Sequence, residues 1–138
     1  MKNGLITSHN GNKEWYLNDK LHRIDGPAVE WSNGSKEWYF NDELHRIDEP
    51  AIEYSDGGKW WYYNGNRHRI NGPAYEDSKG NKEWWYDGYI HRIDGPAVIL
   101  SNGTKEWFFY DEELNENEYN RVMYYYHMYK RIVQEICY

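Results

Sequence analysis

A single 23-residue pattern recurs along most of the chain, and this repetition constrains the fold more than any other feature of the sequence. One tryptophan per copy returns at this step: Trp15, Trp38, Trp61, Trp84 and Trp107. A His-Arg pair returns four times, as His22–Arg23, His45–Arg46, His68–Arg69 and His91–Arg92, and a Pro-Ala pair follows each of them. Self-similarity at a fixed period predicts a repeat protein in which each unit is stabilised by stacking on its neighbours.

Each copy is predicted to contain a strand, a turn, a second strand and a second turn. Residues 13–17 are aromatic-rich and alternate, which predicts a strand. Asn18-Asp19, which is Asn64-Gly65 in the third copy, favours a tight hairpin turn. Residues 21–23 run back, Asp-Gly-Pro bends the chain, and residues 28–31 are extended again. The sequence therefore predicts a mainly β protein made of tandem hairpins.

Strand alternation assigns the side chains to two faces. Lys13, Trp15 and Leu17 share one face, and Glu14 and Tyr16 share the other. Stacking in register would place the five tryptophans in one row. Because each unit contributes two strands about 4.8 Å apart, we expect a rise of about 9.6 Å per unit and an elongated sheet.

One copy departs from the pattern before its proline. Glu49 replaces the glycine found at Gly26, Gly72 and Gly95. A residue before proline is restricted to β or polyproline geometry, which glutamate can adopt. This position therefore does not require a positive φ.

The motif Lys-Glu-Trp-Tyr, followed by His-Arg-Ile-Asp-Gly-Pro-Ala, resembles a divergent MORN-like repeat found in bacterial, phage and giant-virus proteins. The resemblance covers residues 9–110. It implies an antiparallel sheet of consecutive hairpins and a role in protein interaction or scaffolding. Here His-Arg-x-Asp-Gly-Pro-Ala replaces the usual His-Gly-x-Gly of the family, so lipid binding is not carried over to this chain.

The repeat pattern stops after residue 110, and a helix is predicted from Glu116 to Ile136. Asn115 as N-cap and Glu118 at the third helical position form a capping box. Leu114 and Tyr119 are placed as a hydrophobic staple. A seam of apolar side chains recurs three and four residues apart: Tyr119, Val122, Tyr126, Tyr129, Val133 and Ile136, widened by Met123 and Cys137 on one side and by Tyr125 and Ile132 on the other.

We accordingly divide the chain into a repeat region, residues 1–110, and a capping or interaction helix region, residues 111–138. Two roles for the helix remain open, a cap for the array and a partner surface. Tyr124 and Met128 lie outside the seam, which favours a protein interface, including a homodimer through this end. Asp111, Glu112 and Glu113 would lie at the rim of that interface.

Composition narrows the class of partner and the compartment. The net charge of −7 argues against a nucleic-acid or membrane partner and is typical of a soluble protein or of one that binds basic protein surfaces. The chain has one cysteine, Cys137, no signal-peptide core and no stretch long enough to span a membrane. These features predict a cytoplasmic protein.

Two apparent functional motifs have simpler structural explanations. His-Arg-Ile-Asp resembles the kinase catalytic loop but occurs three times without the other kinase motifs. Histidines about 9.6 Å apart cannot share one metal ion. Each arginine is better placed to lie over a tryptophan or to pair with a glutamate of a neighbouring strand. We therefore expect no catalytic, cofactor or metal site.

The sequence thus favours a non-catalytic protein-interaction protein that presents an acidic, aromatic surface. The alternative is a phage-type inhibitor of a nucleic-acid-binding or host-defence protein, in which carboxylates would imitate DNA phosphates. That alternative requires the acidic side chains to lie on one face. Residues 1–110 carry 17 acidic and 13 basic side chains, and residues 111–138 carry six and three.

Overall fold

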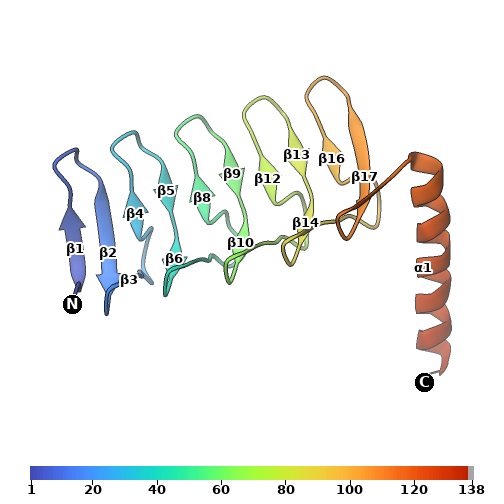
Figure 1. Ribbon diagram of the computed structural model, residues 1–138, viewed down its shortest axis with the longest axis horizontal. Helices are drawn as coiled ribbons and strands as arrows, with labels where there is room; N and C mark the ends of the chain where they lie inside the picture. Colours follow the sequence, from blue (N-terminus) through green and yellow to red (C-terminus); the bar gives the residue numbers. More distant parts are fainter. Residues whose placement is uncertain (137–138) are drawn as a thin grey trace.

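The computed structural model describes residues 1–136 as one elongated antiparallel sheet followed by a single helix (Figure 1). The elements in chain order are β1 Gly4–Thr7, β2 Lys13–Leu17, β3 Lys20–Leu21, β4 Val29–Glu30, β5 Lys36–Glu37, β6 Tyr39–Phe40, β7 Glu43–Leu44, β8 Ile52–Glu53, β9 Lys59–Trp60, β10 Tyr62–Tyr63, β11 Asn66–Arg67, β12 Tyr75–Glu76, β13 Lys82–Glu83, β14 Trp85–Tyr86, β15 Tyr89–Ile90, β16 Val98–Ile99, β17 Lys105–Phe109, β18 Glu112–Leu114 and α1 Glu116–Ile136. The predicted mainly β architecture with a C-terminal helix is confirmed.

Successive units pair with one another in a constant register. The main sheet runs in the order β1-β2-β4-β5-β8-β9-β12-β13-β16-β17-β18. Glu30 lies opposite Lys13 on one side and Lys36 on the other, and Glu53 repeats this arrangement one unit later. Each unit therefore adds two strand positions to the sheet, as the sequence predicted.

Five tight turns close the hairpins along the lower edge in Figure 1. Asn18 and Asp19 have φ of 52° and 65°, and Asn41 and Asp42 have 54° and 71°, as expected for the turn type that asparagine, aspartate and glycine favour. The fifth turn, at Tyr110 and Asp111, joins β17 to β18. The fifth copy therefore completes its hairpin, and the predicted boundary at residue 110 falls inside it.

In each of the first four units, two short segments pair with the strand that carries the tryptophan, and a protruding loop separates these two segments. The Trp15 N–H donates to Ala28 O at 2.8 Å, and the His22 N–H donates to Trp15 O at 2.9 Å. Trp15 therefore pairs with both ends of the segment, and the residues between them bulge from the sheet. We number these excursions loop 1 (23–27), loop 2 (46–50), loop 3 (69–73) and loop 4 (92–96), and we call the side on which they lie the loop face. The opposite side, which carries Glu14 and Tyr16, is the flat face.

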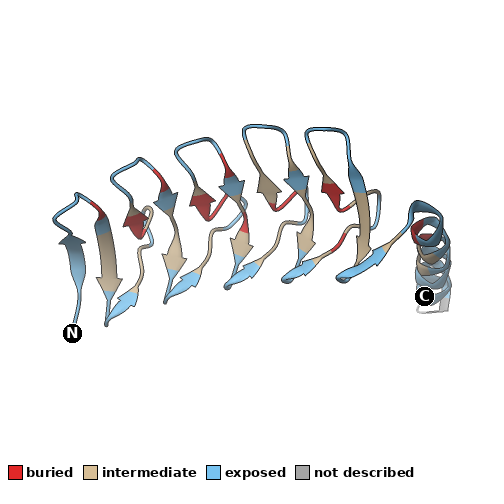
Figure 2. Ribbon diagram, turned by 45° about the horizontal axis from the view of Figure 1, so that its top comes forward, coloured by how far each residue is buried: buried red, intermediate tan, exposed pale blue. Residues whose placement is uncertain are grey.

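The buried core is thin and repeats with the units. Figure 2 shows the buried positions recurring along the array beside exposed turns. The residues after the four prolines are completely buried, and the next position is buried or half-buried: Ala28, Ala51, Ala74 and Ala97, then Val29, Ile52, Tyr75 and Val98. Such a core gains its stability from contacts between neighbouring units.

The helix begins and ends where the sequence predicted. Asn115 Oδ1 accepts hydrogen bonds from the N–H groups of Asn117 and Glu118, and Glu118 Oε2 accepts one from the Asn115 N–H. α1 packs against β17 and β18, and its lower half extends beyond the sheet edge (Figure 1). No helix within residues 1–136 is both long enough and apolar enough to cross a membrane.

Only the first half of the predicted helix seam is used for packing. Tyr119 and Met123 are buried, and Val122 and Tyr126 are half-buried. Tyr129 and Val133, which continue the same seam, are exposed because the helix has passed the edge of the sheet there. The side chain of Ile136 and all of Cys137 lie outside the described residues.

Candidate functional site

The four His-Arg arginines hold the protruding loops in place. Each guanidinium carbon lies 3.8–4.0 Å from the ring centroid of the tryptophan in its own unit, a cation–π contact. In unit 1, Arg23 Nη1 donates to Pro27 O at 3.2 Å and lies 3.5 Å from Glu30 Oε1. Both contacts that the sequence favoured, with tryptophan and with glutamate, are therefore present, and they explain why the pair is repeated without invoking catalysis.

The residue before each proline determines how the arginine packs. A Cβ at Gly26 would lie 2.9 Å from Arg23 Cζ, so glycine allows the guanidinium to lie directly against the backbone. Gly26 and Gly95 have no positive φ, as predicted, although Gly72 has a φ of 150°. In loop 2 the backbone differs: Asp48 has a φ of 62°, and Glu49 forms an ion pair with Arg46. Glutamate is thus accommodated by a different loop conformation and contributes its own contact.

The four histidines join each unit to the next. The Nδ1 atoms of His45 and His68 each accept a hydrogen bond at 3.1 Å from the first N–H of the following hairpin turn. His22 and His91 make the same contact at 3.3 Å. An Nδ1 that accepts an N–H carries no proton, so at His91 this contact requires the neutral ring. Burial lowers the pKa of His91, which favours that form.

The same histidines form part of a continuous row of rings along the loop face. Ring centroids 4.6–6.2 Å apart connect them with the aromatic residue at the end of each tryptophan strand. The row runs His22, Phe40, His45, Tyr63, His68, Tyr86, His91, Phe109 and then Tyr126 of α1. The tryptophan row is different, because each of its first four indoles is covered by an arginine of its own unit.

An isoleucine follows each of these arginines, and all four isoleucines are exposed. Ile24, Ile47, Ile70 and Ile93 have 87%, 68%, 79% and 36% of their surface accessible. They lie in the protruding loops, one per unit. An exposed large apolar side chain is unremarkable alone, but a row of them at a constant interval is a feature of interaction surfaces.

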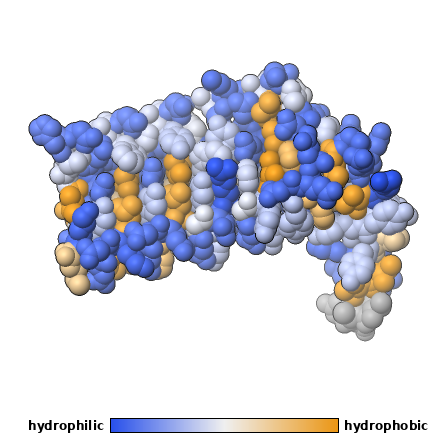
Figure 3. Space-filling model, viewed as in Figure 1, coloured by the Kyte–Doolittle hydropathy of each residue, from blue (hydrophilic) through white to orange (hydrophobic). Residues whose placement is uncertain are grey.

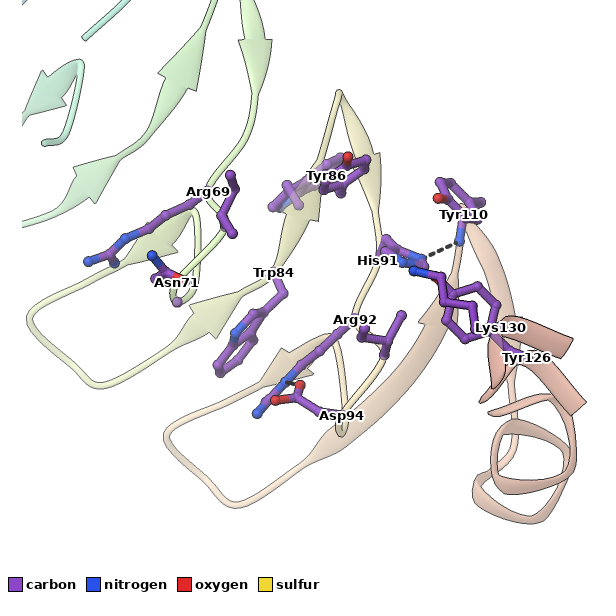
Figure 4. Close-up of a pocket in the computed structure, with 14 residues that line it drawn as sticks. Arg69, Asn71, Trp84, Tyr86, His91, Arg92, Asp94, Tyr110, Tyr126 and Lys130 are labelled. Carbon is purple, nitrogen blue, oxygen red and sulfur yellow. Dashed lines mark hydrogen bonds and ion pairs between the residues drawn. The ribbon is translucent and has the colours of Figure 1, made fainter. Parts of the chain in front are cut away.

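Two grooves lie between successive loops. The first, of about 660 Å³, has walls from loops 2 and 3 and is lined by Trp61, Tyr63 and His68. The second, of about 740 Å³, has walls from loops 3 and 4, and Figure 4 shows Trp84, Tyr86 and His91 lining it. Tyr126 and Lys130 of α1 close one end of the second groove (Figure 4). The fold therefore places apolar walls and aromatic linings side by side in neighbouring units.

The flat face is aromatic and partly acidic, and its polar groups bond to one another. Tyr39 Oη donates to Glu37 Oε2 at 2.9 Å, and Trp31 Nε1 donates to Glu37 Oε1 at 2.8 Å. Burial, assisted by the Glu37 carboxylate, raises the pKa of Tyr39 well above its ordinary value. Hydrophobic columns cross the surface shown in Figure 3 over β4, β8 and β16. In the third unit Arg67 lies 4.2 Å from the Trp60 ring and 4.7 Å from the Trp85 ring, which interrupts the acidic row.

The helix residues proposed for a partner are exposed, but the acidic residues belong to the sheet. Tyr124 and Met128 have 66% and 41% of their surface accessible. Asp111 lies in the fifth hairpin turn, where its Oδ1 accepts the Ile90 N–H at 2.7 Å. Glu112 and Glu113 are in β18. Asp111, Glu112 and Glu113 therefore lie at the edge of the array.

Neither the grouping of possible metal ligands nor the comparison with known proteins identifies a further site. Within residues 1–136, no three His, Cys, Asp or Glu side chains are grouped closely enough to hold a metal ion. The chain matches no protein-family model and no curated protein sequence.

Sequence reasoning missed the isoleucine row, which is the most exposed regular feature of the loop face. A signal was available, because an apolar residue stands between Arg and a polar residue in all four bends, where turns are usually polar. His-Arg-Ile-Asp was considered only as a catalytic motif.

Proposed function

We propose that this chain is a non-catalytic protein-interaction repeat protein and that it binds its partner through the loop face. The observation that carries the proposal is the row of four exposed isoleucines, Ile24, Ile47, Ile70 and Ile93. The polar residues of the same motif have structural contacts within the array, whereas these side chains project from it. The resemblance to MORN-like repeats, together with its implied role in interaction and the cytoplasmic location, belongs to this proposal.

Affinity purification with matched variants tests the proposal. Ile47→Ser with Ile70→Ser removes two exposed apolar tips, so it should leave the fold intact and abolish recovery of the partner. Tyr54→Ser is the control, because Tyr54 is a large exposed side chain on the flat face, with 44% of its surface accessible. A partner that is retained by the control and lost by the isoleucine variant supports the proposal. A partner retained by both, or lost only by the control, refutes it.

A second candidate, an inhibitor that imitates DNA, is favoured only by the glutamates of the flat face. Glu14, Glu37, Glu83 and Glu106 occupy equivalent register positions there. Trp60 replaces the glutamate in the third unit, and Arg67 lies beside it. Glu30 and Glu53 pair with arginines. Loss of partner recovery in Glu37→Gln with Glu83→Gln, with recovery retained by the isoleucine variant, would favour this candidate.

A further inference from the structure

We propose that the two grooves of the loop face bind an extended segment of a partner protein in the polyproline II conformation, with proline or an aliphatic residue at every third position. This inference rests on the proposed function and specifies the ligand of the same surface.

The grooves have the composition that such a ligand requires. Tyr63 lines one groove and Tyr86 lines the other, and Ile70 lies in the loop that separates them. Trp61 and Trp84 also line the grooves, each with an arginine over its ring. Aromatic-lined grooves bind proline-rich segments because that backbone is already extended and pays little entropy on binding. Each groove, at about 660 and 740 Å³, is large enough for several side-chain atoms.

The interval between the grooves selects the backbone conformation. Equivalent features of adjacent units lie two strands apart, about 9.6 Å. Three residues of polyproline II advance about 9.3 Å and return to the same side of the helix. An α-helix returns to the same side after one turn, about 5.4 Å, and again after seven residues, about 10.5 Å; even the second distance is a mismatch about three times larger. A β-strand presents the same side after about 6.7 or 13.4 Å and fits worse.

The charges of the loops indicate which residues the ligand should carry between its apolar anchor residues. Asp25 and Glu49, in loops 1 and 2, have 84% and 61% of their side-chain surface exposed. Each carboxylate pairs with an arginine that is only 22% or 25% exposed, so the carboxylate is the more accessible member of each ion pair. In loop 3, Asn71 takes the place of the aspartate, and Lys130 faces the second groove (Figure 4). The ligand should therefore carry lysine or arginine where it lies beside loop 2.

Synthetic peptides test the period directly. The probe is a fluorescent peptide of four consecutive Leu-Pro-Lys triplets, titrated with the full chain and followed by anisotropy. The first comparison peptide has the same composition with leucines at irregular intervals, and the second has glutamate in place of lysine. We expect the regular lysine peptide to bind at least tenfold more tightly than either. Equal binding of the regular and irregular peptides would overturn the inference.

Variants of the chain locate the binding. Ile47→Ser with Ile70→Ser should weaken the regular peptide at least tenfold, and Tyr54→Ser should leave it within twofold, with circular dichroism confirming that both variants fold. Unchanged affinity in the isoleucine variant places the peptide elsewhere and overturns the inference. If the native partner is lost by the isoleucine variant while the regular peptide does not bind, the ligand class is wrong and the proposed function stands.

Discussion

Replacing Trp61 with alanine removes the most deeply buried indole of the tryptophan row. Trp61 has 7% of its surface accessible, whereas the other four tryptophans of the row are half-buried. The guanidinium carbon of Arg69 lies 3.8 Å from its ring centroid. Trp61 also lies in the middle unit, so both neighbouring units lose contacts when the ring is removed.

Two opposing terms set the size of the effect. Truncating a buried tryptophan to alanine costs about 3–5 kcal/mol. Trp61 Nε1, however, is a buried donor with no hydrogen-bond partner within the described chain, and removing such a group recovers about 1–3 kcal/mol. We therefore expect Trp61→Ala to lower the free energy of unfolding by about 2 kcal/mol. Trp61→Phe keeps a ring beneath Arg69 and removes the unpaired donor, so it should lie within about 1 kcal/mol of the wild type.

Urea denaturation followed by far-UV circular dichroism measures both variants without relying on tryptophan fluorescence. Trp38→Phe is the matched control, because the Trp38 indole nitrogen is not a buried orphan and its removal brings no compensating gain. It should cost more than Trp61→Phe. A Trp61→Ala midpoint equal to that of the wild type would refute the buried role of the ring. If Trp61→Phe and Trp38→Phe lower the free energy of unfolding equally, removal of the unpaired Trp61 Nε1 donor brings no compensating gain, and that part of the reasoning is refuted.

Three further predictions follow from the contacts of the array. Arg46→Lys should lower the free energy of unfolding by about 1 kcal/mol, because an ammonium group cannot reproduce the planar stacking and paired hydrogen bonds of the guanidinium. Urea denaturation measures the change, and a midpoint equal to that of the wild type would contradict the prediction. Because the pKa of His91 is lowered in the folded chain, the unfolded chain takes up a proton at this residue first as the pH falls. The contribution of His91 to the free energy of unfolding is therefore present above pH 6.5 and is lost as the pH falls below it. The decrease in stability between pH 7.5 and 5.5 should be smaller in His91→Gln, and an identical decrease would refute the role given to His91. Tyr124→Ala with Met128→Ala should keep the helical circular-dichroism signal while reducing any self-association seen by light scattering, and an unchanged mass at all concentrations would leave the helix as a cap alone.

The repeat and the helix could be predicted because both depend on local sequence signals. The 23-residue interval, the turn residues such as Asn18 and Asp19, and the capping box around Asn115 act within a few positions of the chain. The stacking of each arginine on a tryptophan could also be anticipated, because the interval is constant and few cations are available.

The protruding loops could not be derived in the same way. Leu21 pairs with Tyr16 and Val29 pairs with Glu14, so a long segment spans a short step along the partner strand. Nothing local distinguishes this excursion from an ordinary bend at Asp-Gly-Pro, because it follows from the register of the whole sheet. The half-used helix seam has a similar cause, since the sheet ends before Tyr129 and Val133 can be covered.

The copies within the chain act as controls for one another, and they separate structural from functional positions. The exposed position after each hairpin turn varies among the units: it is Lys20, Glu43, Asn66, Tyr89 and Glu112. This position packs on nothing essential, and its identity has changed freely. The isoleucine of the loops is equally exposed, yet it is the same in all four units, as constant as the arginine that contacts the tryptophan. An apolar side chain in water contributes nothing to the stability of the array and increases the risk of aggregation. Its constancy therefore supports the proposed contact outside the array, and the constant repeat interval supports a periodic contact.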